Sequence, residues 1–154
     1  WPKVPNFTSE TFDFKIGKGI KMREGTDVTI VSTGHLVWES IDASIKLEKL
    51  GISSEIINIH TIKPLDEEII IKSVRKTNAL VSAEEHNFLG GLGESISRVL
   101  SLNYPVPQEF IATNDTFGES GKPSELMKKY SLDSDSILEA VKKVILRKKW
   151  KKAY

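Results

Sequence analysis

The stretch DVTIVSTGHLVWESIDASIKLEKLG, residues 27–51, decides the fold. Its apolar run at residues 27–31 is typical of a strand buried on both faces, and the Ser-Thr-Gly that follows breaks the run. A helix is expected over residues 36–50, ended by Gly51. Its polar positions form one narrow stripe of Glu39, Asp42, Lys46 and Lys49. Such a helix is covered on most sides, as in a layered α/β domain.

The same alternation of strand and helix continues along the chain. Further strands are predicted at residues 55–59, 79–83 and 109–112, and further helices from the Asp66 cap to residue 76 and over residues 90–102. Strands that alternate with helices of this length pair in parallel through right-handed crossovers. The short run at residues 19–22 has no helix after it, so it is expected to join as an edge strand. The sequence therefore predicts an α/β fold.

Composition favours one globular domain. The chain has 154 residues, of which 39% are apolar and 28% charged, and it contains no cysteine, which excludes disulfide frameworks and thiolate metal sites. No run approaches the about 18 apolar residues of a membrane span, so a cytoplasmic protein is expected. The Pro-spaced residues 1–14 are interpreted as an interdomain linker, residues 15–148 as the domain and residues 149–154 as a basic tail.

The basic C-terminal segment KKVILRKKWKK holds seven Lys or Arg residues and no acid. Such a segment can bind nucleic acid or anionic lipid. Here it continues a helical apolar face at Ile137, Val141, Val144 and Ile145. A solvated helix end is therefore preferred, with neither nucleic acid nor membrane as a partner.

Three histidines, His35, His60 and His86, each follow a predicted parallel strand, where ligands of such sheets bind. They could transfer protons, but no HxH or HExxH spacing supports a metal site. The alternative is that they hydrogen-bond loops or cover a domain interface.

Two Gly-bearing loops are further candidates. Gly90-Gly91-Leu92-Gly93 opens a helix and could cradle a phosphate, although Glu94 would repel an anion there. The alternative is that these glycines permit a tight turn and close packing of helix on strand. The loop NDTFGESG, residues 114–121, could supply oxygen ligands to a cation or could be an ordered connection.

Four motifs together resemble the C-terminal domain of transketolase. They are GTDVTIV with Thr33-Gly34, TIKPLD at residues 61–66, EEH at residues 84–86 followed by GGLG, and DTFGESG at residues 115–121. The resemblance covers residues 15–147. The last motif looks most like transketolases split into two polypeptides, although 1-deoxyxylulose-5-phosphate synthase and the 2-oxoacid dehydrogenase E1 β subunit share several of the others.

The resemblance implies a three-layer α/β/α domain whose mixed five-stranded sheet has an antiparallel first strand. It also implies a whole enzyme that uses thiamine diphosphate and Mg²⁺ to move a two-carbon ketol unit between sugar phosphates, as in the pentose phosphate pathway. In that family the cofactor residues lie in two preceding domains, and this sequence has no GDG motif. No catalytic, cofactor-binding or metal residue is therefore expected here.

Two roles remain for the residues that the fold gathers at its strand ends. The chain could be a structural domain that packs on the preceding pyrimidine-binding domain and the diphosphate-binding domain or subunit, in a homodimer or heterotetramer. It could instead be a regulatory module that binds a phosphate-bearing metabolite. Both roles would use the same residues, here called the strand-end corner: Thr33, Gly34, His35, Glu85, His86, Gly90, Gly91 and Gly93.

Overall fold

Five strands form one sheet in the order β1-β3-β2-β4-β5. The strands are β1 (Ile20–Arg23), β2 (Val28–Ser32), β3 (Ser54–Asn58), β4 (Leu80–Asn87) and β5 (Gln108–Thr113). β1 pairs with β3 in antiparallel fashion and all other pairs are parallel. The predicted mixed sheet with an antiparallel edge strand is therefore confirmed. β4 is longer than expected because its polar end pairs with β5 at Asn87 and Thr113.

This computed structural model describes residues 14–113 and 121–150. The predicted linker at residues 1–14 lies outside this part except for its last residue. Most of the NDTFGESG loop, residues 114–120, and the end of the basic tail, residues 151–154, also lie outside it.

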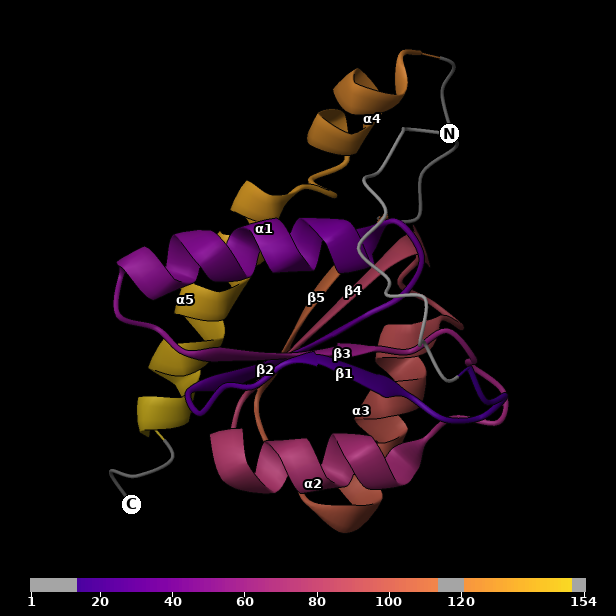
Figure 1. The fold of residues 1–154 in the computed structure, drawn as a ribbon, viewed down its shortest axis with the longest axis vertical. Helices are drawn as coiled ribbons and strands as arrows, with labels where there is room; N and C mark the ends of the chain where they lie inside the picture. The colour runs from indigo at the N-terminus through magenta and orange to yellow at the C-terminus, as the bar shows by residue number, and fades with distance from the viewer. Residues whose placement is uncertain (1–13, 114–120, 151–154) are drawn as a thin grey trace.

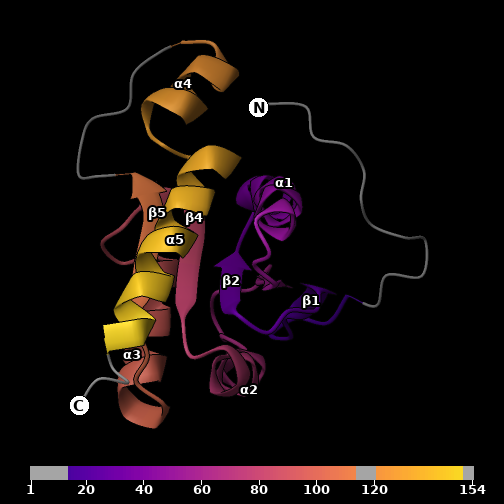
Figure 2. The same ribbon diagram turned by 90° about the vertical axis from the view of Figure 1, so that its left-hand side faces the viewer.

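The helices cover both faces of the sheet, which confirms the three layers (Figure 1). α1 (Leu36–Lys49) and α5 (Ser134–Trp150) share one apolar core with the sheet, and α2 (Glu67–Thr77) and α3 (Leu92–Asn103) share the other. The short α4 (Pro123–Lys129), which the sequence did not predict, lies beyond the carboxyl end of β5 (Figure 2). Within the described ranges, no helix is long and apolar enough to cross a membrane.

β2 is buried along its whole length. Val28 and Ile30 belong to the core under α1 and α5, whereas Val31 belongs to the core over α2 and α3. Thr29 points to α2, where its hydroxyl lies 2.6 Å from the hydroxyls of Ser73 and Thr77. This double burial explains why the strand is apolar except for Thr29, whose hydroxyl is paired, and Ser32 at its end.

The start of α2 is fixed as the sequence predicts. The Asp66 carboxylate accepts the Ile69 N–H at 3.4 Å, which caps the helix. It also accepts the Gly19 N–H at 2.9 Å, so the same side chain holds the approach to β1. Leu65 and Ile70 pack in the core over α2 and α3, as a hydrophobic staple requires.

The polar stripe of α1 faces the first residue of α5. The Ser134 N–H donates to Glu39 at 2.8 Å, and its hydroxyl donates to Asp42 at 2.6 Å. Lys46 donates to the same hydroxyl at 2.8 Å. The stripe therefore anchors one helix on another, and Ser134 is buried in the process.

The basic end of α5 contacts the amino edge of the sheet. Lys148 donates to the backbone carbonyls of Asp27 at 3.0 Å and Thr77 at 2.6 Å, and Arg147 donates to that of Gln108 at 2.7 Å. Thr77 ends α2, where the helix dipole favours a cation. For these two residues the prediction of a solvated helix end is wrong, because both side chains donate to backbone carbonyls. The carbonyl partners lie far away in sequence, so the local pattern could not indicate them.

We expect Lys148→Met to lower the free energy of unfolding by about 1–2 kcal/mol, since two carbonyls would lose a charged donor. The matched control is Lys142→Met on the same helix. Lys142 is exposed and pairs only with Glu139 in the described structure, so its loss should cost less than about 0.5 kcal/mol. Urea denaturation of both variants measures the difference, and equal midpoints would show that the carbonyl contacts contribute nothing.

Asp42 provides a pH-dependent contribution to stability. The Ser134 hydroxyl and, to a smaller degree, Lys46 lower the pKa of Asp42 below its usual 3.8 despite partial burial. A lowered folded-state pKa stabilises the fold above the unfolded-state pKa, and this stabilisation is lost as the pH falls through the folded-state value. The stability difference between wild type and Asp42→Asn should therefore be largest at neutral pH and narrow below the usual pKa of 3.8. Denaturation at several pH values tests this; a constant difference would contradict it.

Candidate functional site

The chain leaves β2 and β4 in opposite directions. These strands are parallel neighbours, with Ser32 opposite Ala83 near their carboxyl ends. β2 continues into α1 on one face of the sheet, and β4 continues into α3 on the other (Figure 1). The two connecting loops therefore diverge and leave a crevice, which is where ligands of open α/β sheets bind.

A cavity of about 300 Å³ occupies this crevice. It is lined by Thr33, Gly34, His35, Ile62, Glu84, Glu85, His86, Gly90 and Gly91. All predicted residues of the strand-end corner except Gly93 thus line one cavity. The sequence missed two lining residues, Ile62 and Glu84.

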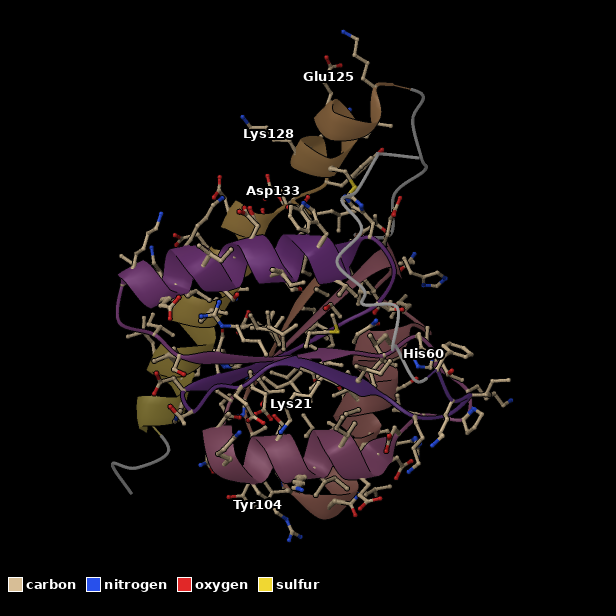
Figure 3. The ribbon with its side chains drawn as sticks, in the orientation of Figure 1. Lys21, His60, Tyr104, Glu125, Lys128 and Asp133 are labelled. Carbon is tan, nitrogen blue, oxygen red and sulfur yellow. The ribbon has the colours of Figure 1, made fainter. Side chains whose placement is uncertain are left out.

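His60 does not line this cavity. It lies at the carboxyl end of β3 (Figure 3), where its ring packs on Phe14 with centroids 4.3 Å apart. Its Nδ1 lies 3.0 Å from the Thr61 hydroxyl. Only two of the three histidines therefore meet, because β3 is separated from β4 by β2.

Glu84 fills the amino end of α3. The side chain is buried, and its two carboxylate oxygens accept the N–H groups of Leu92 at 2.7 Å and Gly93 at 2.8 Å. These are the donors that a bound phosphate would need. A negative charge at a helix amino end is favourable, and here the protein supplies that charge itself.

The glycines of GGLG allow the chain to pack closely around the Glu84 carboxylate. A Cβ at Gly91 would lie 2.2 Å from the Glu84 carboxylate, so only glycine allows the close approach. Gly90 has φ +76°, a conformation that glycine adopts without strain, and its N–H donates to Glu94 at 2.6 Å. Gly93 lies against Ser82 and Phe110 in the first turn of α3, away from the cavity. These contacts agree with the interpretation that the glycines permit a tight turn, at Gly90, and close packing of helix on strand, at Gly91 and Gly93.

His35 is the most enclosed of the cavity's titratable side chains after Glu84. Its side chain is 10% exposed, and its Nε2 lies 3.5 Å from Glu39 Oε1. The other oxygen of Glu39 accepts the Ser134 N–H. His35 therefore connects the cavity with the junction of α1 and α5.

Glu85 and His86 lie within β4, not after it as expected, because the strand continues to Asn87. Both side chains are exposed. His86 Nδ1 lies 2.8 Å from the Asn87 carbonyl oxygen. Since a carbonyl only accepts, Nδ1 carries a proton, and in the neutral form of the ring Nε2 is an acceptor.

The arrangement is rich in acceptors and poor in free donors. Within residues 14–113 and 121–150, no group of three His, Cys, Asp or Glu side chains could hold a metal ion. The site can accept hydrogen bonds and exchange protons through its imidazoles. It is poorly suited to an anion, because Glu84 already takes the helix N–H groups.

The position of Glu84 in the sequence could have predicted its contact with α3. Alternation along β4 places Leu80, Ser82 and Glu84 on one face, and Leu80 belongs to the core over α2 and α3. A carboxylate on that face lies under the next helix of the chain. The same alternation could have identified it as the partner of the glycine-rich turn.

Comparison with known proteins identifies relatives. The family described as "Transketolase, C-terminal domain" matches residues 17–137. A Clostridium sp. (strain MSTE9) protein named "6-deoxy-6-sulfo-D-fructose transketolase subunit SqwH" is 41% identical over 93% of this chain and 44% of its own length. A "1-deoxy-D-xylulose-5-phosphate synthase" from Caldanaerobacter subterraneus subsp. tengcongensis is 35% identical over 83% of this chain and 21% of its own length.

A solved structure agrees. The chain described as "Split gene transketolase, inactive beta4 tetramer" superposes with a TM-score of 0.90 at 39% identity, over 93% of this chain and 47% of that chain. The present chain thus spans less than half the length of each of these relatives. Because the family match runs from the approach to β1 into α5, the chain belongs to the transketolase C-terminal domain family.

Proposed function

We propose that this chain is the C-terminal, noncatalytic domain of a transketolase-type enzyme that transfers a two-carbon ketol unit between sugar phosphates in the cytoplasm. Its role is assembly. The strand-end corner packs on the pyrimidine-binding domain, and the whole enzyme, a homodimer or heterotetramer, includes the diphosphate-binding domain or subunit. A 1-deoxyxylulose-5-phosphate synthase is the second candidate for the whole enzyme, favoured by the relative at 35% identity.

The relatives support an assembly role. The solved split-gene relative is an inactive tetramer of β chains, so a protein of this kind associates without being active by itself. The Clostridium relative is a transketolase subunit, which is consistent with an enzyme divided between polypeptides.

The described residues do not fit thiamine diphosphate or its metal. The sequence has no GDG motif. The glycine-rich turn before α3 gives its N–H groups to Glu84, and no three-ligand metal group occurs in the described part of the chain. We therefore place the cofactor, with Mg²⁺, in the other domains and assign no chemical step to this chain.

Glu84 is the observation that separates assembly from regulation by a phosphate-bearing metabolite. Such a ligand would have to displace a buried carboxylate from its two N–H donors. It would also meet Glu85, which lines the same cavity. Repulsion between like charges opposes that exchange, so the cavity favours a protein neighbour over a phosphate.

Glu84→Gln should lower the free energy of unfolding by about 1.5–3 kcal/mol, because one helix N–H loses a charged acceptor and meets an amide N–H₂ group. Glu85→Gln, with an exposed side chain, serves as the control and should change stability by less than about 0.5 kcal/mol. Thermal or urea unfolding measures both. Equal stability of the two variants would contradict the capping role of Glu84.

The 154-residue chain should neither bind thiamine diphosphate with Mg²⁺ in calorimetry nor transfer ketol units. Mixed with the remaining domains of its enzyme, it should join a defined complex and raise ketol transfer above that of those domains alone. Parallel assays of ketol transfer and of 1-deoxyxylulose-5-phosphate formation discriminate the two candidate enzymes. Micromolar cofactor binding by this chain alone would overturn the proposal.

A further inference from the structure

Three acceptor groups in the cavity have unused capacity. The Glu85 carboxylate makes no hydrogen bond or ion pair within the part of the chain that the structure describes. His86 donates through Nδ1 to a carbonyl, which leaves its Nε2 as an acceptor. Both side chains line the cavity, so their free acceptors are available to a molecule that enters it.

His35 offers a third acceptor in the same cavity. Its side chain is 10% exposed, and its Nε2 lies 3.5 Å from Glu39 Oε1. In the neutral tautomer that carries its proton on Nε2, toward this carboxylate, Nδ1 is an acceptor, and no described residue donates to it. This nitrogen is not among the fully buried polar atoms without a partner, so a donor that enters the cavity can reach it.

Exposed apolar side chains line the cavity or neighbour its lining residues in sequence. Ile62 lines it and is 41% exposed, and Phe88 and Leu89, which stand between His86 and Gly90, are 39% and 51% exposed. No Lys or Arg of the described ranges lines the cavity. A cavity with free acceptors, a nearby exposed apolar surface and no cation of its own is complementary to a long cationic side chain with an apolar stem.

We propose that the cavity receives an arginine side chain from the neighbouring domain of the same enzyme, an inference that rests on the assembly role proposed above. A guanidinium group has five donors in a planar fork and no acceptor, which suits Glu85, His86 and His35 together. Its apolar stem packs on Ile62, which lines the cavity. Arginine surrounded by apolar contacts is a common anchor of protein interfaces.

The first test uses N-ethylguanidinium as a probe of the 154-residue chain labelled with ¹⁵N-histidine. Saturable shifts of the His35 and His86 ring nitrogens are expected with this probe and not with inorganic phosphate. Glu85→Gln should weaken the binding about fivefold, the factor of one partly exposed ion pair. Glu68→Gln is the matched control, because Glu68 is an exposed residue of α2 outside the cavity. Shifts with phosphate but not guanidinium would overturn the proposal.

The second test uses the whole enzyme in sedimentation velocity. Glu85→Lys should dissociate the complex, whereas Glu68→Lys should leave it intact; both side chains are exposed, so neither variant is expected to unfold the domain. A complex that survives Glu85→Lys would overturn the arginine inference and leave the assembly role standing. A wild-type chain that never joins the other domains would overturn both.

Discussion

β2 has neither a free edge nor a free face, and this constraint determines the arrangement of the other elements. It is hydrogen-bonded to β3 on one side and β4 on the other, and helices cover it above and below. The next two strands in the sequence, β3 and β4, therefore pair with opposite edges of β2. Right-handed connections then place α1 and α2 on opposite faces of the sheet. For the same reason the loops that follow β2 and β4 diverge. The cavity at the strand ends is thus a consequence of topology before any side chain is chosen.

The features of the fold that depend on local sequence patterns could be predicted. Alternation of apolar strands with helices determined the layers, and the Asp66 cap and the Gly51 stop set helix boundaries that the structure reproduces within a few residues. The gathering of His35, His86 and GGLG at one place also followed, because it needs only the strand order. The edge position of residues 19–22 needed only the absence of a helix after them.

Features that depend on partners far away in sequence could not be predicted in this way. The polar end of β4 reads as a loop, yet pairing with Thr113 extends the strand to Asn87. Arg147 reads as a solvated cation, yet it meets a carbonyl of β5. Glu84 reads as the end of a strand, and only the packed position of α3 turns it into a helix cap. In each case polarity alone does not say whether a group meets water or another part of the chain.

The contacts of Lys148 have a consequence for how the domain is made. The carbonyls that it binds belong to Asp27 and Thr77, which precede it by 121 and 71 residues. During translation these carbonyls leave the ribosome long before their partner exists. Contacts of such high sequence separation cost more loop-closure entropy than local ones, so these two carbonyls can meet the lysine only after the last helix has been synthesised.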